Sequence, residues 1–233
     1  MGGEQGTPAG KDPQTTSLPL AKNRGGARGK GPPGTPPDKA QRNFTDPQSR
    51  IMRTKDGFIQ GFNAQAAVDA AAQVIVAQTV SDQASDCPHL VGLVDQIATN
   101  LQARPEQVSA DAGYCSEDNL AALETCGIDA HIATGRQKHG AAAPAARPGK
   151  PGSRVAAMAE KLRAAGRQGP YRLRKQVVEP VFGQIKQARG FRQFLRRGLA
   201  AVQSEWSLIC TVHNLLKLAK ARPALQPAMV GMA

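Results

Sequence analysis

One predicted helical face near the C-terminal end of the chain combines a single carboxylate with several cations. Residues 141–233 carry 17 basic and 3 acidic side chains, and Glu179 is one of those three. Arg172 and Lys175 stand seven and four positions before Glu179, and Lys186 stands seven positions after it. These offsets share one face of an α-helix. A carboxylate among cations can hold a divalent metal ion while the cations hold phosphate oxygens, but a solvated face with ion pairs has the same pattern.

Asp111 is a second carboxylate in a position typical of functional sites. It follows Gln107–Ala110, which predicts a short strand, and it precedes the turn residue Gly113. At the C-terminal end of a strand in an α/β sheet, side chains point into the functional crevice. An ordinary turn aspartate before a glycine fits the same residues, and Asp111 alone does not decide between the two interpretations.

Arginines and phenylalanines alternate after the helix of Glu179, which is typical of a nucleic-acid-binding surface. The residues are Arg189, Phe191, Arg192, Phe194, Arg196 and Arg197. Arginine binds phosphate with two parallel hydrogen bonds, and aromatic rings stack on bases. The alternative is a basic helix end whose phenylalanines belong to the core.

The charge of the chain is unevenly distributed. Of the formal net charge of +12 over 233 residues, residues 1–50 carry +4, residues 51–140 carry −6 and residues 141–233 carry +14. A basic C-terminal third favours a polyanionic partner such as nucleic acid. No stretch reaches the roughly 18 consecutive apolar residues of a membrane span, and the first residues show no signal-peptide pattern. We therefore expect a protein that is neither secreted nor inserted in a membrane.

The elements that must position these residues follow from the spacing of apolar side chains. Alternating and β-branched stretches predict strands, and apolar residues three and four apart predict helices. In chain order we expect strands at 58–69 and 74–80 joined by a turn at 70–73, a helix at 89–101, a strand at 107–111, a helix at 116–126, a strand at 129–134, and helices at 171–189 and 203–220. This order predicts an α/β fold.

The composition predicts the boundaries of the compact part. Residues 1–43 hold nine Gly and seven Pro, so we expect a disordered tail. We expect the sheet and helices of the core at 44–135, a linker or insertion at 136–170 with room for a short helix at 156–165, the C-terminal helices with Glu179 and the basic patch at 171–221, and a second tail at 222–233.

Three segments are long enough to be specific for a protein family. They are Asp-Gly-Phe-Ile-Gln-Gly-Phe-Asn-Ala-Gln from Asp56, Ala-Asp-Ala-Gly-Tyr-Cys-Ser-Glu around Asp111, and Val-Val-Glu-Pro-Val-Phe-Gly-Gln-Ile-Lys-Gln-Ala-Arg-Gly-Phe-Arg around Glu179. These segments strongly resemble the DDE transposases of bacterial insertion sequences, and the resemblance runs from about Asn43 to Lys220. It implies a ribonuclease H-like core, a mixed sheet with flanking helices.

The resemblance also implies roles for single residues. Asp111 would be the second carboxylate of a catalytic triad and Glu179 the third, both ligands of two Mg²⁺ ions, which prefer oxygen ligands. The family carries its first carboxylate on a strand before the hairpin, a place taken here by the Gly- and Pro-rich tail, which cannot supply a central strand. Asp69, at the hairpin turn, is the nearest substitute by order. Asp86 is interpreted as a helix-start residue.

Some members of the superfamily surround the glutamate with a tyrosine at minus seven, an arginine at minus four and a lysine at plus seven. Arg172, Lys175 and Lys186 stand at the matching positions, and the tyrosine is displaced to Tyr171. The resemblance therefore implies DNA contacts for these three cations, in addition to the arginines of the following stretch.

The function implied is that of a transposase, truncated before its first catalytic strand, in metal-dependent cleavage and strand transfer of transposon-end DNA. It would act with DNA in the bacterial cytoplasm, without a small-molecule substrate, and assembly into a homo-oligomer on DNA stays open. Two other functions fit the residues. One is a catalytically inactive DNA-binding remnant that uses only the C-terminal cations, and the other is a ribonuclease H-like nuclease unrelated to transposition.

Overall fold

The computed structural model describes residues 43–54, 57–135, 150–166 and 169–221. All of these residues belong to one compact unit, 42–233. The tails expected at 1–43 and 222–233, apart from Asn43, lie outside the described residues, as does the first part of the expected linker, 136–149.

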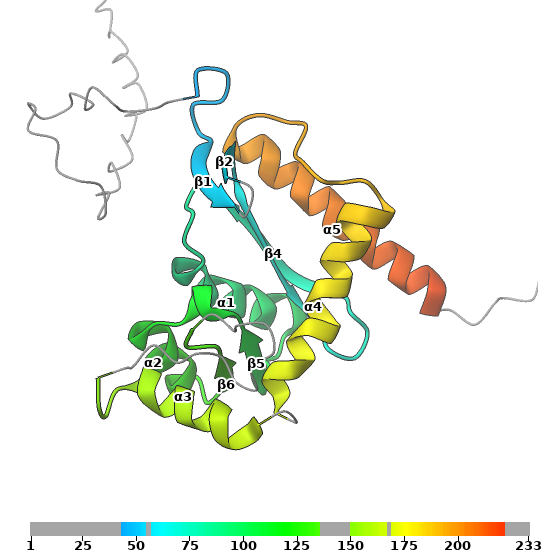
Figure 1. Ribbon diagram of the computed structural model, residues 1–233. Coiled ribbons are helices and arrows are strands. Elements are labelled where there is room, and N and C mark those ends of the chain that lie inside the picture. Colours follow the sequence, from blue (N-terminus) through cyan, green and yellow to red (C-terminus); the bar gives the residue numbers. More distant parts are fainter. Residues whose placement is uncertain (1–42, 55–56, 136–149, 167–168, 222–233) are drawn as a thin grey trace, which may run out of the picture. The chain divides into compact units, whose positions relative to one another are not determined.

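Six strands pair into two-stranded sheets in this part of the chain (Figure 1). β1 (Arg50–Thr54) and β2 (Gly57–Gly61) are antiparallel, as are β3 (Asn63–Val68) and β4 (Ile75–Ser81), whereas β5 (Gln107–Ala110) and β6 (Asp129–Ile132) are parallel. The strand expected at 58–69 is two strands, because β2 pairs with β1, which the sequence did not predict, and β3 pairs with β4. The expected turn at 70–73 is confirmed by a 2.8 Å backbone hydrogen bond between Asp69 and Val74.

Helices separate and follow the strands. They are the short turn η1 (Cys87–His89), α1 (Leu90–Leu101), the turn η2 (Ala112–Tyr114), α2 (Glu117–Thr125), α3 (Arg154–Ala165), the turn η4 (Pro170–Arg172), α4 (Leu173–Gly183) with its π-helical extension η5 (Gln184–Ala188), and α5 (Leu199–Ala221). The mixture of strands and helices confirms the expected α/β class. None of the described helices has the length and apolar character needed to span a membrane.

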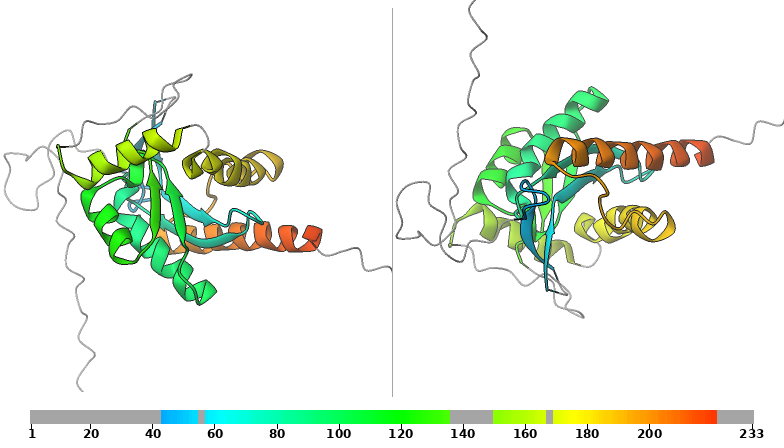
Figure 2. Two further views of the ribbon diagram at one scale, coloured as in Figure 1. Left: turned by 90° about the horizontal axis from the view of Figure 1, so that it is seen from below. Right: turned by 90° about the horizontal axis from the view of Figure 1, so that it is seen from above.

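The β3–β4 sheet is covered on both faces (Figures 1 and 2). On one face, Ala77 of β4 packs against Leu93 and Ile97 of α1. On the other face, the sheet packs against α4, η5 and α5 through a larger cluster that includes Val181, Ile185, Val202 and Trp206. Trp206 is 3% exposed, and its indole N–H donates to the Gln65 carbonyl at 3.0 Å, so this tryptophan is a core residue.

The β5–β6 pair packs against α1, α2 and α3 through a second core. Leu123 of α2, Ile132 of β6 and Leu162 of α3 are buried in it together. Glu117 of α2 accepts hydrogen bonds from the first two backbone N–H groups of α3, at 2.9 and 3.1 Å, which fixes the start of that helix. Residues 154–165, in the segment expected as a linker or insertion, thus form a packed helix.

Helix α4 depends on a hydrogen bond from the hairpin. Pro180 lies inside α4 and has no N–H, so the carbonyl of Gln176, four residues earlier, loses its helical partner. The side-chain amide of Gln73 in the hairpin turn donates to this carbonyl at 2.9 Å. Beyond Gly183 the helix widens into the π-helical η5, where the sequence predicted a regular helix to residue 189. The tip of the β3–β4 hairpin is therefore tied to the helix that carries Glu179.

The outer edge of β4 is closed by side chains. The amide of Asn214 on α5 bonds both the N–H and the carbonyl of Ile75, each at 2.8 Å. Gln203 of α5 and Gln96 of α1 accept the N–H groups of two further β4 residues, each at 2.8 Å. Because these amides come from two helices, the pairing fixes both helices along β4.

His213 of α5 is fully buried between the hairpin turn and a cation. Its Nε2 lies 2.9 Å from the Gln73 carbonyl, and its Nδ1 lies 3.0 Å from the Arg189 guanidinium. A carbonyl requires a protonated Nε2 and a guanidinium requires an unprotonated Nδ1, so the ring is neutral. Burial lowers the pKa of His213, and the charges of Arg189 and Lys217 lower it further, against the opposing effect of the Gln73 carbonyl.

We predict that the free energy of unfolding decreases as the pH falls below about 6.5, the ordinary histidine value. Because the pKa of His213 is lower in the folded chain, the unfolded chain takes up the proton first as the pH falls. The neutral His213 therefore stabilises the folded chain above about pH 6.5, and this contribution is lost as the pH falls toward the folded pKa. His213→Gln keeps a donor for the Gln73 carbonyl but has no group that titrates in this range. In urea unfolding, the free energy of unfolding of this variant should therefore change less between about pH 7 and pH 5 than that of the unmodified chain. Equal slopes in the two proteins would contradict the assignment.

Candidate active site

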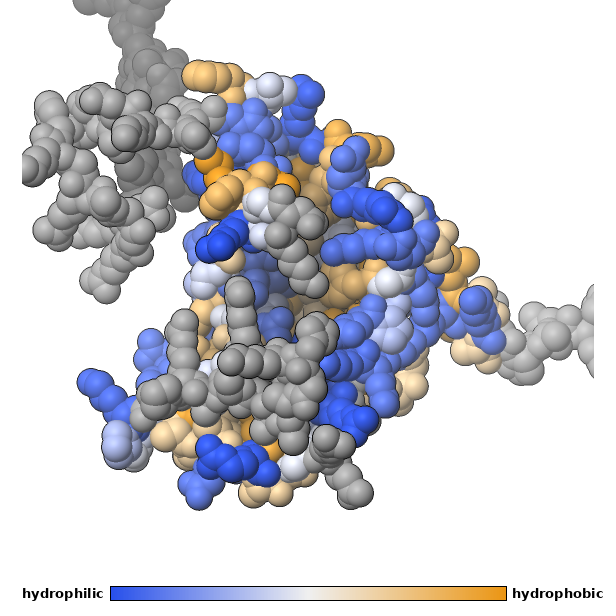
Figure 3. All heavy atoms as spheres, in the orientation of Figure 1, coloured by the Kyte–Doolittle hydropathy of each residue, from blue (hydrophilic) through white to orange (hydrophobic). Residues whose placement is uncertain are grey.

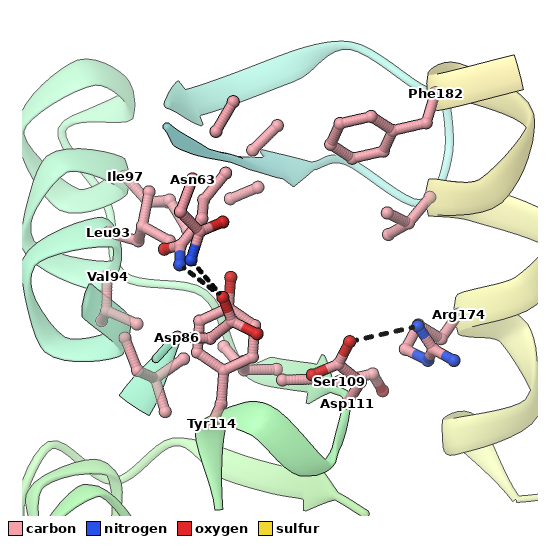
Figure 4. Close-up of a pocket in the computed structure, with 18 of the residues that line it drawn as sticks. Asn63, Asp86, Leu93, Val94, Ile97, Ser109, Asp111, Tyr114, Arg174 and Phe182 are labelled. Atoms are coloured by element: carbon pink, nitrogen blue, oxygen red, sulfur yellow. Dashed lines mark hydrogen bonds and ion pairs between the residues drawn. The ribbon is translucent and has the colours of Figure 1, made fainter. Parts of the chain in front are cut away.

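One cavity of about 360 Å³ brings together residues of β3, β5, α1 and α4 and of the turns next to them (Figure 4). β3 and β5 border it with their strand edges, and α1 and α4 contribute apolar side chains. In Figure 3 a hollow with apolar surface lies beside α4, whose outer side chains are hydrophilic. The polar and charged residues of the cavity that can do chemistry are Asp86, Asp111, Tyr114, Arg174 and Lys186.

The Asp86 side chain does more than its interpretation as a helix-start residue implies. It makes no capping hydrogen bond to η1. Its Oδ1 instead accepts from the side-chain amides of Asn63 at 2.7 Å and Gln65 at 2.9 Å, both on β3. Because strand residues two apart share a face, these two amides reach the same oxygen. Asn63 and Gln65 stand two positions apart in a predicted strand, so their side-chain amides lie on one face. This pair is a sequence signal for a polar partner such as Asp86 at the cavity.

Asp111 has both of the features its sequence position suggested. It follows β5 and accepts the Gly113 N–H at 3.0 Å, as a turn aspartate does, and it also lines the cavity. A methyl group on Gly113 would overlap Oδ2 of Asp86 and lie 3.1 Å from Oδ1 of Asp111. The two carboxylates therefore converge on the same point, and a glycine is needed for their approach.

Tyr114 lies near enough to both of these carboxylates to feel their charge. Burial raises its pKa above the ordinary value of 10, and the negative charges of Asp86 and Asp111 raise it further. The phenol therefore stays protonated and can act as a hydrogen-bond donor in the cavity. The sequence motif around Asp111 contains this tyrosine, but no spacing or motif connects it with Asp86.

Arg174 connects Asp111 with Glu179. Its two terminal nitrogens lie 4.0 Å from Asp111 Oδ2 and 3.9 Å from Glu179 Oε1, so the two carboxylates stand on either side of one guanidinium. The guanidinium lies 5.6 Å from the centre of the Tyr171 ring, and its buried Nε has no hydrogen-bond partner among the described residues. Sequence reasoning missed Arg174, because it lies five positions before Glu179, outside the offsets of three, four and seven that mark one helical face.

The other residues expected near the site are distributed along the same helix and the hairpin. Arg172 and Lys175 are exposed. Lys186 lines the cavity and lies 5.4 Å from the centre of the Phe182 ring. Asp69 lies apart from the cavity residues, in the hairpin turn, where its Oδ2 accepts the Ala72 N–H at 2.7 Å.

The arginine and phenylalanine stretch after η5 contains both core and exposed residues. Phe194 packs edge-on against Trp206 with ring centres 6.2 Å apart, so it is a core residue. Phe191 is 39% exposed. Arg189 is half-buried against His213, whereas Arg192, Arg196 and Arg197 are exposed. Glu205 of α5 accepts backbone N–H groups of this loop at 2.9 to 3.1 Å, which holds the exposed arginines on one segment.

The cavity offers oxygen donors to a cation. Asp86 and Asp111 supply carboxylates, and Gln65, 4% exposed, has a buried Oε1 for which the described residues provide no hydrogen-bond partner. An oxygen donor set fits a hard divalent ion such as Mg²⁺. Within the described ranges, no three His, Cys, Asp or Glu side chains gather closely enough to hold a metal ion. Glu179 is separated from Asp111 by Arg174.

We predict that Gly113→Ala destabilises the protein by about 1–3 kcal/mol, the usual cost of overpacking. The added methyl would push the Asp86 carboxylate away from Asn63 and Gln65, which chemical unfolding and the amide side-chain NMR signals would report. Gly183→Ala is the matched control, because a methyl there meets no atom within 4 Å and alanine is the better helix former. A Gly113→Ala protein as stable as the unmodified chain would contradict the close approach of the carboxylates.

The comparison with known proteins agrees with this architecture. The family model described as transposase DDE domain matches residues 28–215, which include Asp86, Asp111 and Glu179. No curated protein and no solved structure matches the chain. The match spans most of the chain and confirms the resemblance found in the sequence. The chain belongs to the family of transposase DDE domains, and its mixed α/β architecture is that of a ribonuclease H-like transposase domain.

Proposed function

We propose that this transposase cleaves transposon-end DNA and transfers the cut strand in a reaction that depends on divalent metal ions. The observation that supports the proposal most strongly is the convergence of Asp86 and Asp111 in one cavity, with Glu179 on the far side of Arg174. Carboxylates that meet beside cations can hold metal ions and phosphate oxygens at the same place. Membership of the transposase DDE domain family supports DNA as the substrate.

In this proposal Asp111 and Glu179 are the second and third carboxylates of the family triad, and both hold Mg²⁺. Asp86 is the further carboxylate that the fold places next to Asp111. Asp69 is less suited to that role, because its carboxylate is engaged at the tip of the hairpin and is not a cavity residue. In such sites two bound ions supply charge neutralisation at the scissile phosphate and a more acidic attacking water.

The chain's own cations would position the DNA backbone. Arg174 lies at long distances from both carboxylates, so its ion pairs are weak, and it can turn toward a phosphate oxygen. Lys186 lies on the same wall of the cavity. The exposed arginines Arg192, Arg196 and Arg197, together with Arg172, Lys175 and Arg189, would extend this contact along the backbone of the duplex.

A catalytically inactive DNA-binding remnant is the second candidate. It is favoured by the absence, within the described ranges, of three metal-ligating side chains around one point. The two candidates differ in one observable, since both bind DNA and only the first cleaves it in the presence of Mg²⁺.

We predict weak, Mg²⁺-dependent nicking of supercoiled plasmid DNA by the unmodified chain, because only two of the three carboxylates meet directly. Asp111→Asn, Glu179→Gln and Asp86→Asn should each abolish the nicking, whereas Asp69→Asn should leave it unchanged. Asp95→Asn is the control, because Asp95 is an exposed carboxylate of α1 that does not line the cavity.

Two results would redirect this assignment. Nicking that is lost in Asp69→Asn and kept in Asp86→Asn would place the first carboxylate at the hairpin turn. A chain that binds DNA and shows no Mg²⁺-dependent nicking would be the inactive remnant.

We predict DNA binding with a strong salt dependence carried by the loop after η5. Replacing Arg192, Arg196 and Arg197 with alanine removes three phosphate contacts, so the slope of log K against log salt concentration should decrease by about three. The control replaces the exposed Arg53, Arg104 and Arg163, which lie outside this loop, and removes the same charge. Equal decreases in both triple variants would show that the binding reflects net charge and not this loop.

A further inference from the structure

The outer face of α5, on the side away from the β3–β4 sheet, is uncharged over most of its length. Each residue that is exposed between Leu199 and Ala219 is uncharged, and the large ones among them are leucines: Leu208, Leu215, Leu216 and Leu218. These four side chains are 42 to 65% exposed. The outer face of a surface helix ordinarily carries charged and polar side chains. A run of exposed leucines without charges therefore indicates an interaction surface.

Four exposed residues of α5 follow the spacing of a coiled-coil seam. Leu208, Thr211, Leu215 and Leu218 stand three, four and three positions apart, and we call them the α5 seam. This alternation sets side chains in one line along a helix and lets them interlock with those of a second helix. The buried residues of α5, such as Trp206, lie on the opposite side of the helix. In both views of Figure 2 the second half of α5 extends beyond the other described elements.

The spacing of the α5 seam fits a second copy of this chain. The intervals of three, four and three positions read the same in both directions. Two antiparallel seams can therefore pair position by position about a twofold axis, as the interface of a symmetric dimer requires. Leu208 then meets Leu218 of the second copy, and Thr211 meets Leu215 of the second copy. Every layer of the pair contains at least one leucine.

The charges that flank the seam fit the antiparallel direction. Glu205 stands three positions before Leu208, the exposed Lys220 stands two positions after Leu218, and both lie to the same side of the seam. In an antiparallel pair the start of one helix lies beside the end of the other, so Glu205 comes near Lys220 of the second copy. In a parallel pair these two residues would lie about 22 Å apart along the helix axis. Charge complementarity of this kind fixes the orientation of an interface more than it adds affinity.

We propose that the α5 seam is the interface of an antiparallel homodimer, in which the α5 helices of two copies pack against each other. The apolar area that leaves water on pairing supplies the driving force, because it belongs to leucines that are exposed in the single chain. No seam residue lines the cavity, so pairing leaves the cavity of each copy accessible. This interface goes beyond the proposed DNA chemistry and requires neither DNA nor metal.

The test measures the mass of the full chain by sedimentation equilibrium, without DNA or metal. The mass should rise with concentration from 24.5 kDa toward twice that value. Leu215→Glu puts a carboxylate into two layers of the pair, so the Kd of the dimer should rise about 100-fold or more. Leu101→Glu, at the similarly exposed end of α1, is the matched control and should leave the Kd unchanged. Thermal unfolding of each variant controls for damage to the fold.

Two charge variants test the antiparallel direction. Leu208→Glu and Leu218→Lys should each weaken the dimer when present alone. An equimolar mixture of the two variants should form the dimer again, because the new carboxylate of one chain then lies opposite the new ammonium group of the other. In a parallel pair these two groups would lie about 15 Å apart along the axis, and the mixture would stay monomeric.

Three outcomes would overturn the proposal. They are a mass that stays at 24.5 kDa at every concentration, a dimer that survives Leu215→Glu, and a mixture of the two charge variants that stays monomeric. The first would mean that another segment of this chain or a different protein covers the seam, the second that copies associate through another surface, and the third that the helices do not pair in antiparallel. None of them bears on DNA nicking, so the failure of this proposal and that of the proposed function are distinguishable.

Discussion

Asparagine and glutamine side chains bind the backbone groups along the outer edge of β4. A buried backbone N–H without a partner is costly, and here Asn214, Gln203 and Gln96 supply the partners that a neighbouring strand would otherwise provide. These amides belong to α5 and α1, so both helices must lie along β4. Helix α5 in turn holds α4, because Trp206 stacks on Phe182 with ring centres 5.9 Å apart. The side chains that pair with the edge of β4 thereby fix the positions of α1 and α4, the two helices that line the cavity.

The positions of the carboxylates follow from the same arrangement. With β4 closed on its outer side, the free edge of β3 faces the cavity, and its amides Asn63 and Gln65 hold Asp86 there. Asp111 arrives from the end of β5, and Gly113 permits the close approach of the two charges. Pro180 frees a carbonyl of α4 for the hairpin, and this contact places the helix with Arg174 and Glu179 across from Asp111.

Local patterns predicted the parts of this structure that local interactions determine. The turn at 70–73 and helix α1 follow from residues that are neighbours in the sequence, as does the end of β5 before Asp111. The division of one expected strand into β2 and β3 depends on a change of pairing partner, which periodicity does not report. The hydrogen bond that supports α4 next to Pro180 joins Gln73 to the Gln176 carbonyl, 103 residues later in the chain.

The position of Asp86 also depends on contacts with residues far away in the sequence, which local patterns do not predict. A helix-start position was visible in the sequence, but the amides that hold its carboxylate lie 23 and 21 residues away. Arg174 was missed because it connects two elements and matches no periodicity of its own helix. A motif singled out Asp111 and Glu179 in the sequence, whereas the places of Asp86 and Arg174 at the candidate site depend on contacts that only the tertiary fold brings about.

That Asp86 and Asp111 form one cation site is tested most directly by titrating Mn²⁺ into isotopically labelled chain and following paramagnetic broadening by NMR. If the two carboxylates share an ion, the amides of Gly113 and Tyr114 and the side-chain amides of Asn63 and Gln65 broaden first, and Asp86→Asn removes the effect. Broadening that begins at the hairpin turn of Asp69, or that spreads evenly over exposed carboxylates, would contradict a shared site.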